Sequence, residues 1–120
     1  MTTYTIHFAT AFTRFPAGRF KIHGPYTGEG FRDDILIPAL EAHPHVTVDF
    51  DEVMGLGSGF LEETFGGLIR KGYTVADLRT RLELVDIPCP ADVDRAWGFM
   101  EDAETPVVRQ TLKEMRRKKR

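Results

Sequence analysis

The sequence contains a single cysteine, Cys89. One cysteine excludes an intramolecular disulfide, and it also excludes a zinc or redox site built from a CxxC pair. The first residues lack the basic segment and apolar stretch of a secretory signal peptide. No apolar run approaches the roughly 20 residues that cross a bilayer. These absences predict a cytoplasmic protein without membrane contact.

A length of 120 residues predicts one domain, too short for a two-half dinucleotide-binding fold. The charge is uneven: residues 113–120 carry a net +5, which leaves −7 on the first 112 residues. The basic segment is most simply a solvated helix end, and nucleic-acid binding through it is the alternative. We therefore divide the chain into a domain at 1–104 and a C-terminal helix with a basic tail at 105–120.

Alternating apolar and polar residues predict four strands, at 4–8, 20–22, 46–50 and 82–85. A turn at 15–18 suggests that the first two strands form an antiparallel hairpin. The strands at 46–50 and 82–85 are predicted to be parallel, because a helix connects them.

Apolar residues at helical spacing predict helices between and after the strands. We expect them from Thr27 to Pro44 with a kink at Pro38, from Ser58 to Gly72, over 74–80, over 93–100, and from Thr105 onward. Thr27 and Thr74 are the predicted N-caps of their helices. The order predicts an α/β fold: a small mixed sheet of about four strands backed by helices, with additional C-terminal helices. An α+β arrangement with helices on one face only is the runner-up.

The loop after the strand at 46–50 is the most informative segment. Gly55, Gly57 and Gly59 surround one hydroxyl, Ser58, directly before a helix. Ser58 is most simply the N-cap of that helix. A phosphate on Ser58 would be stabilised there, because a helix start carries partial positive charge. Phe60 stands where a dinucleotide fingerprint needs its third glycine, so we exclude that motif.

The strand, acidic turn, small residues, serine and leucine-bearing helix resemble a STAS domain (sulfate transporter and anti-sigma factor antagonist). The run Gly-Ser-Gly-Phe-Leu at 57–61 matches the Asp-Ser-Ser/Thr-Gly-Leu of the antagonists, with Gly57 in place of Asp. About 15–85 is similar to a bacterial family labelled STAS-like, of no assigned function. The most specific matches are the runs at 26–32, 36–40 and 58–68.

The resemblance implies a non-catalytic regulatory module that binds a protein partner, as an anti-sigma factor antagonist does. In such antagonists a serine or threonine at the helix start is phosphorylated by an ATP-binding partner of histidine-kinase-like fold, and the phosphorylated form dissociates. Ser58 is the matching phosphoacceptor candidate. The predicted partner-binding residues are Met54, Gly55, Leu56, Gly57, Ser58, Gly59, Glu62 and Glu63.

Other candidate sites receive simpler interpretations. Acidic residues around the loop could perform acid–base chemistry, but a solvated rim of a docking surface is the favoured interpretation. The four histidines are scattered, so we predict no metal site, and we predict no cofactor and no catalytic residue. Gly66 and Gly67 lie inside a predicted helix and indicate a close approach, either by the sheet or by a partner.

Overall fold

The computed structural model describes residues 3–86 and 88–105. Within them, three strands form one sheet in the order β1 (Thr3–His7), β2 (His45–Asp49) and β3 (Leu82–Val85). Both pairings are parallel: Ile6 aligns with Val48, and Val48 aligns with Leu84. The predicted α/β class is confirmed, and so is the parallel pairing of the two later strands.

The predicted hairpin is wrong. Residues 21–23 form a short 3₁₀ helix, η1 (Lys21–His23), and β1 pairs with β2 instead. Phe20 and Ile22 are 43% and 89% exposed, so their alternation does not mark a buried sheet face. Phe8 begins a short helix, α1 (Phe8–Ala11). In the described residues the sheet therefore has three strands rather than four, and it is parallel rather than mixed.

Two long helical segments connect the strands, and each has a π-helical turn in its middle. The first comprises α2 (Gly28–Phe31), η2 (Arg32–Leu36) and α3 (Ile37–Ala42). The second comprises α4 (Ser58–Leu61), η3 (Glu62–Gly66) and α5 (Gly67–Arg70). Pro38 lies in the first turn of α3, directly after the π-helical turn η2, where a residue without an N–H donor is accommodated.

The remaining described helices are α6 (Val75–Arg81) and α7 (Pro90–Ala103). The predicted caps at Thr27 and Thr74 are confirmed, because their side chains accept hydrogen bonds from the N–H groups of Gly30 and Asp77. The helix predicted from Thr105 and the basic tail fall mainly on 106–120, outside the described residues. No helix in the described ranges is long and apolar enough to cross a membrane.

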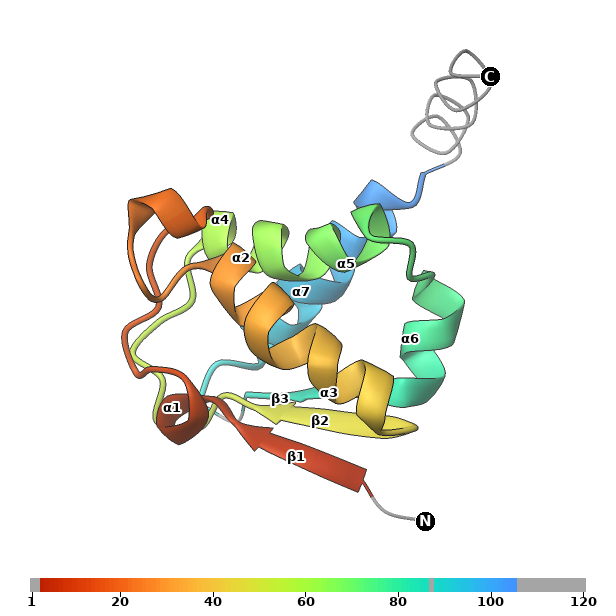
Figure 1. Ribbon diagram of the computed structural model, residues 1–120, viewed down its shortest axis with the longest axis horizontal. Coiled ribbons are helices and arrows are strands. Elements are labelled where there is room, and N and C mark those ends of the chain that lie inside the picture. The colour runs from red at the N-terminus through yellow and green to blue at the C-terminus, as the bar shows by residue number, and fades with distance from the viewer. Residues whose placement is uncertain (1–2, 87, 106–120) are drawn as a thin grey trace.

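Apart from α1, which lies at the end of the sheet where β1 ends, the helices lie on one side of the sheet (Figure 1). Residues of the sheet that face them are buried: Ile6, Val46, Val48, Leu82 and Leu84. Five phenylalanines join this core from the surrounding elements: Phe8, Phe31, Phe50, Phe60 and Phe65. The alternate strand positions, including Thr5, Thr47 and Glu83, are exposed or half-buried. The sheet is thus parallel, as in an α/β fold, yet covered by described helices on one face only, as in the runner-up arrangement.

Candidate functional site

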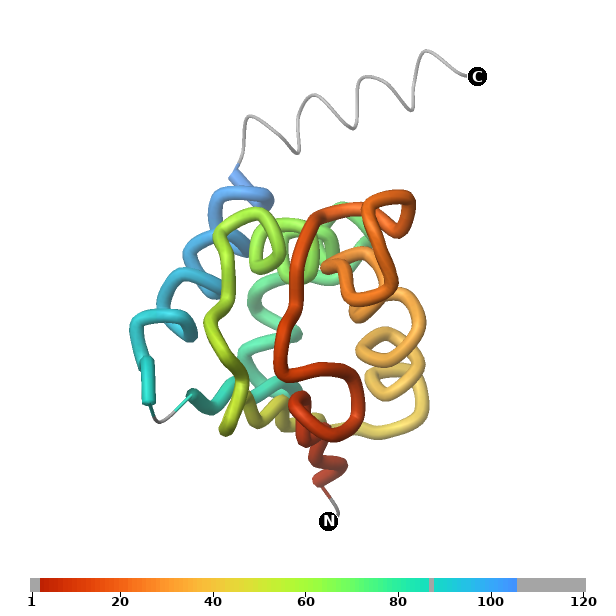
Figure 2. The backbone as a smooth tube through the Cα atoms, turned by 90° about the vertical axis from the view of Figure 1, so that its left-hand side faces the viewer, coloured from red at the N-terminus to blue at the C-terminus, as the bar shows by residue number. Residues whose placement is uncertain are grey.

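The loop 50–57 runs from the end of β2 to the start of α4. Its ends are fixed by burial of Phe50 and Leu56, whereas Met54 between them is 70% exposed. The loop lies alongside the segment that follows α1 (Figure 2), and the Met54 N–H donates to the Arg14 carbonyl at 2.8 Å. Gly55 has a φ of +95°, a conformation that favours glycine. The buried side chains of Phe50 and Leu56 therefore hold a short loop whose middle is exposed at Met54.

Ser58 is exposed and is the first residue of α4. The predicted helix start is confirmed, but the interpretation of Ser58 as its N-cap is wrong. Gly57 is the N-cap, and no side chain caps this helix end. Ser58 already has helical backbone geometry, so its hydroxyl does not reach back to the first free N–H groups. The hydroxyl oxygen instead accepts a hydrogen bond from Arg95 Nη1 at 3.0 Å. Ser58 is the one serine in the sequence.

Arg95 is the residue of this site that the sequence did not reveal. It projects from α7, and its Nη2 donates to the Leu56 carbonyl at 2.7 Å and to Asp92 Oδ1 at 2.6 Å. One guanidinium thus holds the loop backbone, the Ser58 hydroxyl and a carboxylate. The spacing of Asp92 and Arg95 is a readable i, i+3 pair. Arg95 also contacts Ser58, which lies 37 residues earlier in the chain, and no pattern in the neighbouring sequence indicates this contact.

Asp86 is linked to Arg95 through Asp92. It follows β3, and its Oδ1 accepts a hydrogen bond from the Cys89 N–H at 3.1 Å. Asp86 and Asp92 are 8% and 7% exposed, and their side chains are within hydrogen-bonding contact. Burial, followed by the contact with Asp92, raises the pKa of Asp86 to about 6. The Asp86 carboxyl therefore keeps its proton to a higher pH than an ordinary aspartate.

The predicted partner-binding residues fall into two groups. Met54, Gly55, Gly57 and Ser58 are exposed, and Gly59 and Glu62 are half-buried. Leu56 and Glu63 are buried, so their side chains stabilise the domain from inside. The exposed residues lie in the loop and at the first residue of α4.

Glu62 and Glu63 are paired with arginines rather than forming an acidic rim. Glu62 bonds Arg19 and Arg70, each at 2.6 Å. Burial would raise the pKa of Glu62, but these two guanidinium groups lower it overall. Glu63 Oε2 accepts from Arg32 Nη1 at 2.6 Å, inside the domain. Glu62 is therefore held ionised by its neighbours, and Glu63 is bonded to an arginine inside the domain; such pairing suits structural roles better than proton transfer.

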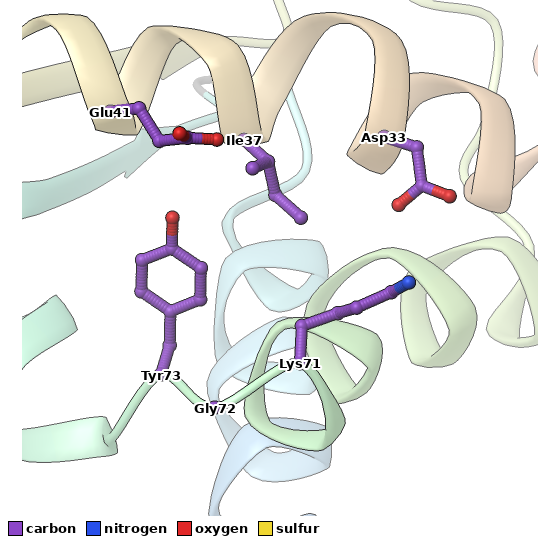
Figure 3. A pocket seen from close by; sticks show the side chains of 6 residues that line it. All are labelled: Asp33, Ile37, Glu41, Lys71, Gly72 and Tyr73. Carbon is purple, nitrogen blue, oxygen red and sulfur yellow. The ribbon is translucent and has the colours of Figure 1, made fainter.

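A separate hollow of about 520 Å³ lies between the first long helical segment and the end of the second. Asp33, Ile37 and Glu41 line it from one helix face, and Lys71 and Tyr73 line it from the opposite side (Figure 3). The Tyr73 hydroxyl points toward Glu41. Burial and the charge of Glu41 raise the pKa of Tyr73, so its hydroxyl stays a neutral donor. This mixed lining could receive a small amphipathic group.

None of the predicted partner-binding residues lines that hollow, so it is distinct from the Ser58 surface. Among the described residues, no group of three or more His, Cys, Asp or Glu side chains is placed to hold a metal ion. Cys89 is exposed at the start of α7.

Comparison with known proteins adds a family. No significantly similar curated protein and no significantly similar solved structure was found. The family described as "STAS-like domain of unknown function (DUF4325)" matches residues 27–88. This match covers both long helical segments, β2, β3 and the Ser58 loop. The resemblance seen in the sequence is thereby confirmed, and the chain belongs to this family of STAS-like domains.

Proposed function

We propose that this STAS-like domain is a non-catalytic, regulatory protein-interaction module that docks its partner through residues 54–59 and the first turn of α4. The partner is a histidine-kinase-like ATPase, and phosphorylation of Ser58 releases it. The observation that carries the proposal is the exposed Ser58 hydroxyl, set at the start of a helix on an exposed loop and held by Arg95. A hydroxyl in this position is open to a modifying enzyme and lies inside the surface that it would regulate.

The loop is open for docking. A Cβ at Gly55 or Gly57 would meet nothing within 4 Å, so no other part of the described chain covers them. Met54 is 70% exposed, and its N–H is bonded to the carbonyl of Arg14, next to Phe15, which is 67% exposed. Exposed methionine and phenylalanine side chains are typical of protein-binding surfaces. These features favour a partner with an apolar patch of its own.

Phosphorylation would change this surface at its centre. The partner transfers the terminal phosphoryl group of ATP to Ser58 Oγ: the new P–O bond forms, the bond to the ADP oxygen breaks, and the hydroxyl proton leaves to a base of the partner. The product carries a charge of about −2. That charge would repel an acidic partner surface and add bulk under the docked loop, so the complex would dissociate faster.

The residues around the loop support a binding role more than an enzymatic one. The carboxylates of Glu62 and Glu63 are bonded to arginines, and the 520 Å³ hollow lies elsewhere. A smaller hollow of about 270 Å³ at the start of the loop is lined by Asp51 and Glu52 but by none of residues 54–59. A reaction centre needs a proton donor or acceptor facing a space where substrate can bind. At residues 54–59 the described structure offers an exposed surface instead.

Phosphorylation is tested by incubating the purified protein with γ-labelled ATP and an extract of the cells that produce it. We expect label on Ser58 by peptide mass spectrometry, and none on Ser58→Ala. Thr80→Ala, at an exposed position on α6, is the matched control and should be labelled normally. Label confined to other residues, or no label at all, would overturn the assignment of Ser58.

Docking is tested with the purified ATPase that labels Ser58. Ser58→Asp should weaken its binding about tenfold or more, as a mimic of the negative charge. Met54→Asp should weaken binding to a similar degree, whereas Thr80→Asp should leave it unchanged. Equal binding by all four proteins would show that the partner docks elsewhere.

A further inference from the structure

Four polar side chains form a continuous series of contacts from the end of β3 to the start of α4. Asp86 contacts Asp92, Asp92 Oδ1 accepts from Arg95 Nη2 at 2.6 Å, and Arg95 Nη1 donates to Ser58 Oγ at 3.0 Å. The two carboxyl groups are buried, whereas Ser58 is exposed. One guanidinium therefore links a buried acid pair to the surface hydroxyl.

The charges in this cluster are unbalanced when every acid is ionised. Asp86 faces Asp92 from α7 and Asp49 from the end of β2. Arg95 is bonded to Asp92, and His7 Nδ1 lies 3.6 Å from Asp49 Oδ2. A single proton shared by Asp86 and Asp92 leaves one negative charge, which Arg95 neutralises. Loss of that proton places two carboxylates side by side in a buried position, where their repulsion is weakly screened.

We infer that Arg95 couples Ser58 to this carboxyl pair, so that a negative charge placed on Ser58 and a proton placed on the pair reinforce each other. A phosphate on Ser58 would share the guanidinium with Asp92. Ionised Asp92 would then be less well stabilised, and the pair would hold its proton to higher pH. The inference rests on the proposed function only in taking Ser58 as the place where the charge arrives.

The coupling operates in both directions, because linkage between two equilibria is reciprocal. When the pair holds a proton, Arg95 has less negative charge beside it and attracts a phosphate on Ser58 more strongly. When the pair is fully ionised, the phosphate and two carboxylates compete for one cation. Acidification toward pH 6 would thus favour the state in which Arg95 engages the phosphate.

The same guanidinium carries the effect to the docking surface. Arg95 Nη2 bonds the Leu56 carbonyl at 2.7 Å, two residues from the exposed Met54. A shift of Arg95 toward a phosphate would therefore loosen or re-aim the backbone of the loop. Arg95 is a positioning residue in this scheme, and proton uptake and loop release are two readouts of one event.

The test compares the full-length protein with and without phosphoserine incorporated at residue 58. Carbon NMR of aspartate carboxyl groups, from about pH 4 to about pH 8, follows the carboxyl pair. We expect phosphoserine 58 to raise the titration midpoint of the pair by about half a pH unit or more. Phosphoserine in place of Thr80 adds the same charge on α6 and should leave the midpoint unchanged. Equal midpoints with and without phosphoserine 58, or the same rise from position 80, would overturn the coupling.

Two variants identify the groups. Asp86→Asn should remove the titration near pH 6, which assigns it to this pair. In Arg95→Gln the shared cation is gone, so phosphoserine 58 should raise the titration midpoint by less than about half as much as in the wild type. Arg95→Lys keeps a positive charge and should retain more of this rise. An undiminished rise in Arg95→Gln would show that Arg95 is not the link. All measurements use the isolated protein, so failure of partner docking would not alter them.

Discussion

The guanidinium of Arg32 occupies the space in which a side chain at residue 67 would begin. A Cβ on Gly67 would overlap Arg32 Nη1 and would lie 3.0 Å from its Cδ. Arg32 is 4% exposed, and its Nη1 also donates to the Glu63 carbonyl at 2.8 Å. The close approach indicated by adjacent glycines is therefore made by an arginine of the neighbouring helix, not by the sheet. The bonds between Arg32 and Glu63 join the two π-helical turns, η2 and η3.

Gly67→Ala should lower the free energy of unfolding by about 2–3 kcal/mol. The new methyl group would force Arg32 out of its position and break its 2.6 Å pair with buried Glu63, which would keep only the longer 3.6 Å contact with Arg70. Urea unfolding followed by circular dichroism measures the loss. Gly98→Ala is the matched control, since Gly98 lies within α7 and its Cβ would meet nothing within 4 Å. That variant should be unchanged or more stable by up to about 1 kcal/mol. Equal losses in the two variants would contradict the steric explanation.

Glu63→Ala should cost about 2–3 kcal/mol of stability, because it removes the buried carboxylate from Arg32 and leaves that buried charge only its pair with the partly exposed Asp33. The Arg32 and Glu63 side chains are 5% and 10% exposed. Its neighbour Glu62 is the control: it also pairs with arginines, but its side chain is 25% exposed. Glu62→Ala should therefore cost only about 1 kcal/mol. Chemical denaturation of both variants decides this, and a smaller cost for Glu63→Ala than for Glu62→Ala would refute the buried pair as a stabilising contact.

The sequence predicted what depends on local pattern. The long helical segments, the caps at Thr27 and Thr74 and the strand at 82–85 follow from spacing along the chain. The hairpin failed because Phe20 and Ile22 alternate without being buried, so periodicity alone misassigned them. The loop and helix start at Ser58 were predicted, but Arg95 was not, since its contacts are decided by how α7 packs. Non-local contacts of this kind leave no mark in a single sequence.

Ser58→Ala should change the stability of the protein by less than about 0.5 kcal/mol. Ser58 is exposed and caps nothing, so its removal leaves no buried donor unpaired. Thr27→Ala should cost about 1 kcal/mol or more, because the buried Thr27 side chain accepts from the Gly30 N–H at 3.2 Å. Thermal unfolding of the two variants measures the difference. A larger loss for Ser58→Ala would restore a structural role for that hydroxyl and weaken its interpretation as a switch.

Asp86 should make the protein less stable as the pH rises toward neutrality. Its pKa is about 6 in the folded protein against an ordinary value of 3.8, so the folded state binds more protons than the unfolded state between these values. Stability from this group is therefore complete below about pH 4 and lost through pH 6, by up to about 3 kcal/mol. Asp86→Asn removes this dependence while its side-chain oxygen can still accept from the Cys89 N–H. Urea unfolding across this range should show that the free energy of unfolding of the variant increases relative to that of the wild type as the pH rises. A constant difference would mean that folding leaves the pKa of Asp86 at its ordinary value.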